Sequence, residues 1–319
     1  MRRLVPALLL LACSTPDANL PFLGETGWLS DTDPCAEAVE VVEPAQGEVG
    51  WSPRDDLSLR VVGQANDASL RLRAVGGSVV PTTLQVGEGE AWLRLDEPMQ
   101  PGTEHVLEIE DCAGARAWSF TTDSLGLPVE GGVDALTGAT FRVDLAGATW
   151  DAPQGVGQLL AAAIQDVLVG VRAADPLVID LVGGFGIVED GQVFQADLPT
   201  FDFPPAPFAD APWFLTTAAR FDLVVPGGVV PVGDFTLSGA FSPDGARISG
   251  ARISGLADTR SAGGVVGRPG VATAVCDAAA GLDVACEPCA DGEPTCLRIA
   301  LRRLDAHRVP GLRLDDVLP

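Results

Sequence analysis

The sequence predicts a mainly β protein in two parts: a β-sandwich, then an α+β domain with a twisted antiparallel sheet and one main helix. Three observations support this fold class. Short stretches in which apolar and polar residues alternate begin near Ala38 and are separated by turn residues. One segment, at about residues 155–171, has an apolar stripe with helical periodicity. The 319 residues, 47% of them hydrophobic, are enough for two domains with separate cores.

The N-terminus has the pattern of a secretion signal. Two arginines are followed by an apolar stretch too short to span a bilayer, and the small residue Ala12 precedes Cys13. The sequence Leu-Leu-Ala-Cys at residues 10–13 resembles the bacterial lipobox, in which a signal peptidase cuts before the cysteine. The resemblance implies that residues 1–12 are a lipoprotein signal peptide and that Cys13 carries acyl chains such as palmitate. An ordinary signal peptide with a chance cysteine is the alternative.

Lipid on Cys13 would anchor the protein without a transmembrane helix, because several acyl chains on one residue give lasting attachment and a single chain is marginal. Residues 13–34 are rich in Pro, Asp, Ser, Thr and Gly and predict a flexible tether. The expected location is therefore the cell envelope. Ser14, in place of an acidic residue after the cysteine, favours the outer membrane by resemblance to enterobacterial sorting.

The charge of the chain limits its partners. The formal net charge is −24, from 44 acidic and 20 basic residues, and every basic residue is arginine. Such a surface repels phosphate backbones, so nucleic-acid binding is excluded. The excess of carboxylates is expected to serve solubility. The expected partners are the membrane, through the N-terminal lipid, and an unidentified protein or cell-wall component.

The first domain is predicted at residues 35–124. Its alternating stretches have the period-two pattern of half-buried strands, and Gly, Pro, Asn and Asp occupy the gaps. These stretches are AVEVVEP, DLSLRVV, SLRLRAV, AWLRLDEP, HVLEIEDC and ARAWSFTTD. About seven short strands over roughly ninety residues predict a β-sandwich.

Three short motifs near the end of this domain carry a family resemblance. They are Pro-Gly-Thr at residues 101–103, Asp-x-x-Gly at 111–114 and Phe-Thr-Thr at 120–122. Together they resemble the closing strands of the SbsA-type Ig-like domain of bacterial surface-layer and adhesin-type proteins, over about residues 36–123. His105 stands where that family usually has tyrosine. The resemblance implies a spacer or binding module without catalytic residues.

Two cysteines fall within the Ig-like domain. By the resemblance, Cys35 and Cys112 would fasten the first strand to the turn before the last strand. Such a disulfide would also restrict the unfolded chain.

Four further cysteines lie in the segment CDAAAGLDVACEPCADGEPTC, at residues 276–296. An even set in an oxidising compartment predicts disulfides, with three possible pairings among which the spacing does not choose. A four-thiolate zinc site is disfavoured because only one pair is closely spaced, and a redox-active Cys-x-x-Cys lacks its usual βαβ setting. These residues are Cys276, Cys286, Cys289 and Cys296.

The second domain is predicted at residues 129–319, after a turn-rich boundary near Pro128, and resembles no family that we recognise. Its strands form an antiparallel meander, with turns at 226–228 and 242–245. The segment LPTFDFPPAPFADAPWFL is expected to be an extended ordered loop, because its aromatic rings would not be left in water. These rings would either cover a sheet edge or line a pocket.

No catalytic motif is present, and we predict a protein that is not an enzyme, with no catalytic residue, metal or cofactor. A cluster of arginines near the C-terminus reverses the local charge; it is expected to balance the chain's own carboxylates, with an anionic partner as the alternative. The two histidines are His105 and His307, and the arginines around His307 are Arg302, Arg303, Arg308 and Arg313.

Two functions fit these predictions. The first is a non-enzymatic, membrane-anchored envelope lipoprotein in which the Ig-like module is a spacer or binding module and presents the second domain. The alternative is a carrier that holds a lipid or another apolar ligand inside the second domain. The two differ in whether the inward side chains of the meander at 213–257 fill the space or leave a cavity.

Overall fold

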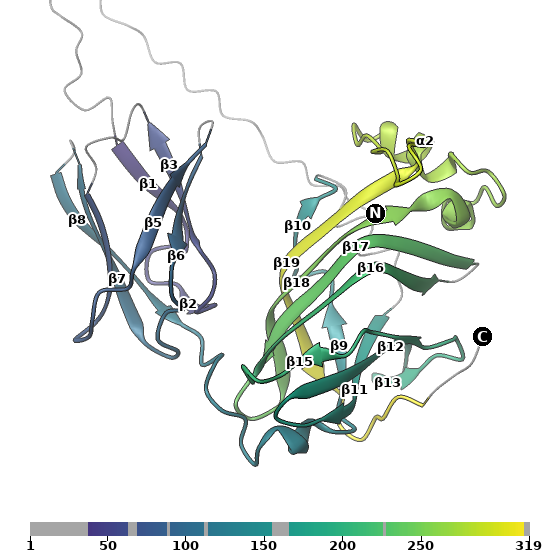
Figure 1. The fold of residues 1–319 in the computed structure, drawn as a ribbon, viewed down its shortest axis with the longest axis horizontal. Helices are drawn as coiled ribbons and strands as arrows, with labels where there is room; N and C mark the ends of the chain where they lie inside the picture. The colour runs from purple at the N-terminus through teal and green to yellow at the C-terminus, as the bar shows by residue number, and fades with distance from the viewer. Residues whose placement is uncertain are drawn as a thin grey trace, which may run out of the picture.

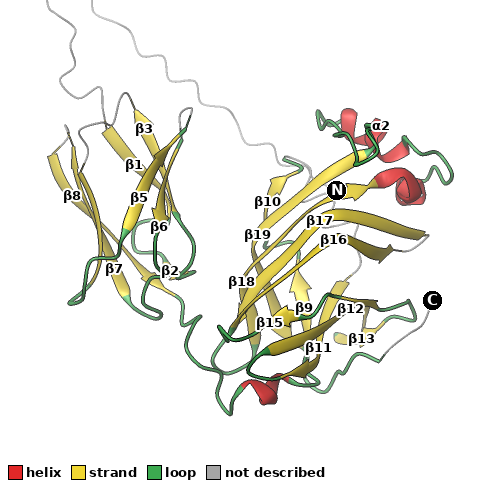
Figure 2. Cartoon of the chain, in the orientation of Figure 1, coloured by secondary structure: helices red, strands yellow, loops and turns green. Residues whose placement is uncertain are grey.

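The computed structural model confirms a mainly β fold (Figures 1 and 2). Strands form two separate regions, each with its own cluster of buried apolar side chains. The structure describes residues 38–62, 69–87, 90–111, 114–154, 166–225 and 228–315.

The N-terminal region is a sandwich of two four-stranded sheets. The first sheet has the order β1 (Ala38–Glu43), β3 (Leu57–Val62), β6 (Ala91–Leu95) and β5 (Thr82–Val86). The second has the order β2 (Val49–Trp51), β8 (Gly114–Thr122), β7 (Glu104–Asp111) and β4 (Ser69–Ala74). The predicted alternation sets the burial, since Leu57 and Leu59 on β3 are 0% and 1% exposed. Strands β2 and β5 were not predicted.

The C-terminal region is built on one 11-stranded sheet. Its main order is β13 (Gln192–Gln195), β12 (Val178–Glu189), β11 (Asp166–Ala174), β9 (Thr140–Asp144), β19 (Cys296–Arg308), β18 (Arg247–Asp258), β17 (Gly228–Phe241) and β16 (Trp213–Val225). Three shorter strands complete it: β10 (Thr149–Ala152), which pairs with β19, and β14 (Phe201–Asp202) and β15 (Ala206–Pro207), which pair with β12. All of the pairings in this sheet are antiparallel, as the meander predicts.

The large sheet curls so that its two ends approach each other (Figure 1). Thr216 on β16 donates a hydrogen bond to the carbonyl oxygen of Pro204, between β14 and β15 (2.7 Å). The register shifts within β17 and β18 lie beside two Ser-Gly pairs, at 238–239 and 249–250, and glycine in a strand often marks a bulge. Bulges of this kind increase the twist of a sheet and allow it to curve.

The predicted main helix at about 155–171 is wrong where the structure describes it, because residues 166–171 belong to β11. Residues 155–165 lie outside the described residues. Val167, Val169 and Val171 satisfy a helical stripe, but they also alternate, and β-branched side chains favour strands. The described helices are short: η2 (Val133–Leu136), η3 (Thr259–Val266) and α2 (Ala274–Ala280).

Carboxylates of the sandwich bind arginines on the outer face of the large sheet. Arg252 on β18 binds Asp55 (2.6 Å), and Arg247 binds both carboxylate oxygens of Asp123 (2.7 and 2.8 Å). Asp55 and Asp123 are almost fully buried, so water screens these pairs less than pairs on an open surface.

A bulge in β19 adds to this contact. One extra residue of β19 lies between the pairs that Leu301 and Leu304 make with β18, and Arg303 has a left-handed backbone (φ 54°). The Arg303 guanidinium lies 4.2 Å from the ring centre of Trp51 in the sandwich, and it is 3.1 Å from Glu43. We call the ion pairs of Asp55, Asp123 and Glu43 with the large sheet the clasp.

Candidate functional site

The concave side of the curled sheet encloses an apolar cavity of about 210 Å³. Its wall is formed entirely by apolar surface. An engineered apolar cavity of roughly 150 Å³ stays dry and binds benzene, so a space of this size is large enough for an apolar ligand. The cavity is therefore the candidate functional site of the chain.

The alternation of the long strands places the side chains of the wall. On β17, Val232, Phe235 and Leu237 point inward, and Phe214 and Phe221 do so on the neighbouring β16. These positions are occupied by Val, Leu and Phe, and the hydroxyl of the lining residue Ser254 is bonded to that of Thr236 (2.6 Å), so the wall offers no accessible hydrogen-bond partner to a ligand. Dispersion and exclusion of water are left as the binding forces.

The cavity has a closed end, where aromatic rings fill the space. Phe241, at the end of β17, has its ring centre 5.6 Å from that of Phe141, 6.0 Å from Phe208 and 5.5 Å from Phe214. The side chains of Phe141, Phe208 and Phe241 are 0% exposed. Water and ligands are thus excluded from the end of the sheet at which β17 ends and β18 begins.

At the other end, the wall is only half-buried. Trp150 on β10, Leu223 near the end of β16 and Ile299 near the start of β19 all line the cavity and retain partial exposure. The turn between β12 and β13 lies at this end, as do the start of β17 and the end of β18. We call this the open end of the cavity.

A group of phenylalanines forms the side of the cavity where the two ends of the sheet meet. The rings of Phe203 and Phe221 are stacked with centres 5.3 Å apart, and Phe221 and Phe235 are 4.4 Å apart. Phe201 lies across Gly183 of β12, where a Cβ atom would be 1.9 Å from the ring. The Phe-rich segment is thus ordered, as predicted, and it both covers the edge of β12 and lines the cavity.

Beside the open end, a cap of residues 259–295 connects β18 to β19 (Figure 1). Two disulfides hold it, between Cys276 and Cys286 and between Cys289 and Cys296. The disulfide prediction is confirmed for these four residues. The close pair of Cys286 and Cys289 is divided between the two bonds, unlike a redox-active Cys-x-x-Cys.

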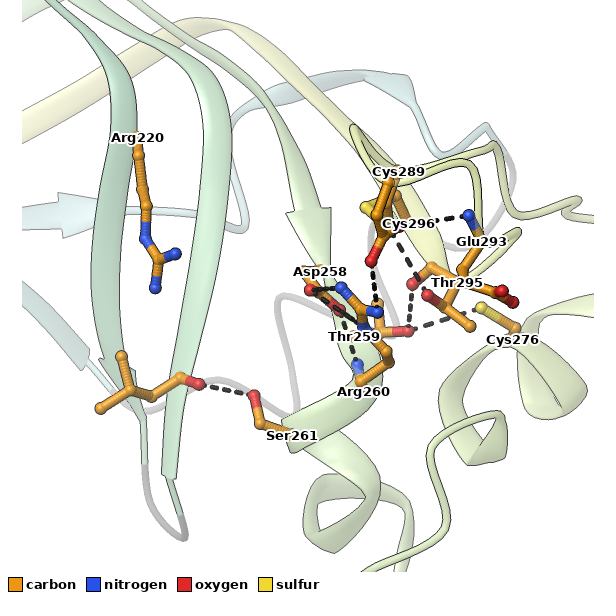
Figure 3. A network of polar contacts seen from close by, with 12 residues as sticks. Arg220, Asp258, Thr259, Arg260, Ser261, Cys276, Cys289, Glu293, Thr295 and Cys296 are labelled. Carbon is orange, nitrogen blue, oxygen red and sulfur yellow. Dashed lines mark hydrogen bonds and ion pairs between the residues drawn. A yellow bond between two sulfur atoms is a disulfide. The ribbon is translucent and has the colours of Figure 1, made fainter.

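Hydrogen bonds join the cap to the sheet (Figure 3). The buried hydroxyl of Thr259 donates to the carbonyl oxygen of Thr295 (2.7 Å), and Ser261 donates to the carbonyl oxygen of Val229 on β17 (2.5 Å). Asp258 accepts hydrogen bonds from the Arg260 guanidinium, which lowers the pKa of that carboxyl group. The cap is thereby fixed over the ends of β17 and β18.

The cap also contains a group of possible metal ligands, Asp258, Cys289 and Cys296, whose ligand atoms lie within 4.8 Å of one another. Both sulfur atoms are used in a disulfide, so neither is a thiolate that could bind a metal ion. This group therefore does not form a metal site in the oxidised protein.

The remaining predicted site residues are dispersed. Cys13, Cys35 and Cys112 lie outside the described residues, so lipidation and the first disulfide stay predictions. His105 is buried in the sandwich and His307 is exposed on β19.

The arginine cluster is divided among different contacts. Arg302 binds Glu43 (3.0 Å) and Asp151 (2.9 Å), and Arg303 lies beside Glu43, so both balance the chain's own carboxylates. Arg313 has its side chain beside Gly138. The described residues thus do not bring these arginines together at one anion site.

No protein-family model and no curated protein matches the chain. None of the helices in the described ranges has the length and apolar character of a membrane span.

The sequence offered a cavity in the second domain only as the alternative, and it did not decide between a filled and a hollow interior. The signal that was present is the density of Phe and Val at alternate positions of long strands, together with the Phe-rich segment. This alternation of apolar residues is the same in a sheet whose inward side chains fill its concave side and in one whose side chains leave a cavity there.

Proposed function

We propose that this protein is a membrane-anchored envelope lipoprotein that carries an apolar molecule in its second domain. The observation that supports the proposal is the cavity of about 210 Å³ with a wholly apolar wall. Filling such a space with a ligand restores the dispersion contacts that an empty wall lacks. The geometry thus favours the carrier over a domain that only presents its outer surface.

The sandwich has a supporting role in this proposal. As an Ig-like spacer, it would hold the carrier domain away from the membrane to which Cys13 is attached. The buried ion pairs of Asp55 and Asp123 support a fixed orientation of the two domains rather than a freely moving joint. The proposed anchor is the lipid on Cys13, and the proposed location is the outer membrane.

Titration with N-phenyl-1-naphthylamine, which becomes fluorescent in apolar surroundings, tests the carrier function on the delipidated protein. Ala251 lines the cavity and is 3% exposed. An Ala251→Phe substitution would place a ring in the space and is expected to weaken binding of the dye at least about tenfold, which corresponds to about 1.4 kcal/mol. Ala219→Phe is the matched control, since Ala219 is exposed on β16.

The two variants give opposite expectations for one chemical change. The carrier function is supported if Ala219→Phe binds the dye as the unchanged protein does and Ala251→Phe does not. Equal binding by both variants would show that the dye sits on the outer surface, and the carrier proposal would then be withdrawn.

A further inference from the structure

The shape of the cavity limits the kind of ligand. On β19, the wall runs from Ile299 to Ala306. At about 3.3 Å per residue, and with one bulge residue that adds no length, this stretch is roughly 20 Å long. A space of only about 210 Å³ beside this stretch has room for one hydrocarbon tail at most. The stacked rings of Phe203 and Phe221 lie along its side, with centres 5.3 Å apart. An extended hydrocarbon chain fits such a space better than a rigid ring system.

The apolar wall continues outward past the open end. Ile187 follows the cavity residue Phe185 by two positions on β12, so both side chains lie on the same face of the sheet. Phe194 on β13 is the cross-strand partner of Ile187, so its side chain lies on the same face. Ile187 is 38% exposed and Phe194 is 42% exposed. We call these two residues the rim, because they extend the inward face into water.

Accessible polar surface is found only outside this path. The wall contains no accessible polar surface, and the exposed acidic residues Glu189 and Asp190 lie at the end of β12 and in the turn after it. A polar or charged group inside the cavity would lose its hydration without gaining a partner. The same group at the open end remains in water.

From these observations, we propose that the ligand is a single-chain amphiphile, such as a fatty acid or a lysophospholipid. It inserts tail first through the open end and keeps its head group beside the rim. This inference rests on the proposed carrier function and makes it specific. The second chain of a two-chain lipid would find no room and would stay in water, at a cost for every exposed methylene.

Displacement of the bound naphthylamine dye tests the ligand class. We expect palmitate and lysophosphatidylcholine to displace the dye at a concentration at least about tenfold lower than dipalmitoyl phosphatidylcholine or a sterol, a difference of about one decade in Kd. Displacement by the sterol alone would overturn the single-chain inference and leave the carrier function intact. If the dye does not bind in the cavity at all, the carrier function fails first.

Quenching of Trp150 tests the direction of insertion. Trp150 lines the wall at the open end of the cavity, where its strand pairs with β19 at Leu301. Stearic acid with a nitroxide at carbon 5, near the head group, is expected to quench this tryptophan more strongly than the acid labelled at carbon 16. Trp150→Phe should remove the difference, which separates Trp150 from the other tryptophans. Stronger quenching by the carbon-16 label would show head-first insertion and overturn the proposal.

A pair of neighbouring substitutions tests the rim. Ile187 and Val188 are adjacent on β12 and similarly exposed, at 38% and 48%, but they point to opposite faces. Ile187→Asp is expected to slow the association of palmitate severalfold, since a hydrated carboxylate would interrupt the apolar path. Val188→Asp should leave the rate unchanged. Equal rates for the two variants in stopped-flow measurements would place the access route elsewhere and contradict the rim.

Discussion

The sandwich and the curled sheet solve the same packing problem in different ways. In the sandwich, two sheets face each other and Leu57, Leu72, Leu107 and Phe120 close the space between them at 0% exposure. In the second domain, one sheet must cover its own concave face, and its inward side chains meet fully only at the closed end. The difference shows that inward-facing apolar side chains can form either a filled core or a cavity, and that the curvature of the sheet decides which.

The largest expected effect separates the two interiors by adding volume to each. Ala91 in the sandwich is 0% exposed and Ala251 lines the cavity at 3%. Ala91→Phe is expected to destabilise the sandwich by about 3 kcal/mol, because extra atoms in a filled core force strain on their neighbours. Ala251→Phe should change the stability of the second domain by less than about 1 kcal/mol. Urea unfolding followed by tryptophan fluorescence measures both; equal losses would erase the proposed difference between the cores.

The cap disulfide should matter only to the second domain. Removing the Cys289–Cys296 bond with the double variant Cys289→Ser and Cys296→Ser is expected to cost about 2 kcal/mol, since the unfolded chain gains freedom. Calorimetry should show a lower Tm for the transition of the second domain and an unchanged one for the sandwich. A joint shift of both transitions would mean that the two regions unfold as one unit.

The clasp should couple the two regions by a smaller amount. A double-mutant cycle on Asp123→Asn and Arg247→Gln is expected to give a coupling energy of about 1 kcal/mol. The reason is that the Asp123 side chain is largely buried and both of its carboxylate oxygens accept a hydrogen bond from Arg247. The control cycle uses Glu40 and Arg60, a pair on the sandwich surface that is more than half exposed and should couple by less than about 0.3 kcal/mol. Similar values in both cycles would reduce the clasp to an ordinary surface contact.

The smallest expected effect is a pH dependence confined to the sandwich. His105 is fully buried, and burial lowers its pKa below 6.5, against the opposing effect of its hydrogen bond to the carbonyl oxygen of Thr103. As the pH falls below about 6.5, the unfolded chain binds a proton that the folded chain does not, so stability decreases. His105→Phe should abolish this decrease between pH 7 and 5.5. The free energy of unfolding is measured by urea at each pH. If it falls by the same amount in both proteins, other groups cause the acid sensitivity.

Much of the strand pattern could be predicted from the sequence, because alternation is a local property. Leu57 and Leu59 alternate with polar neighbours and are buried as expected. The segment from 155 to 171 is apolar almost throughout, so its periodicity does not distinguish a helix from a strand, and β11 was assigned to the wrong class.

The candidate site depends on contacts that are distant in sequence. Phe201 reaches the cavity because it lies across Gly183 in a short pairing of β14 with β12, and no local pattern announces that pairing. The same holds for Asp55 and Arg252, which are 197 residues apart in the chain. Curvature and long-range pairing, rather than residue type, decide where the space is left.

The position of β16 at the end of the large sheet has a consequence for the protein in solution. This strand is 13 residues long; one part of it lies against β14 and β15, and beyond that part a terminal strand exposes backbone groups that can pair with another chain. The exposed charges of Arg220 and Asp222 interrupt its surface, and a net charge of −24 makes copies of the protein repel one another. Acid neutralises the carboxylates and salt screens them, so either condition removes the repulsion while the edge remains. The carboxylates that make the chain so acidic therefore also keep it from aggregating. Once their charge is neutralised or screened, the first contact between two copies would form along β16.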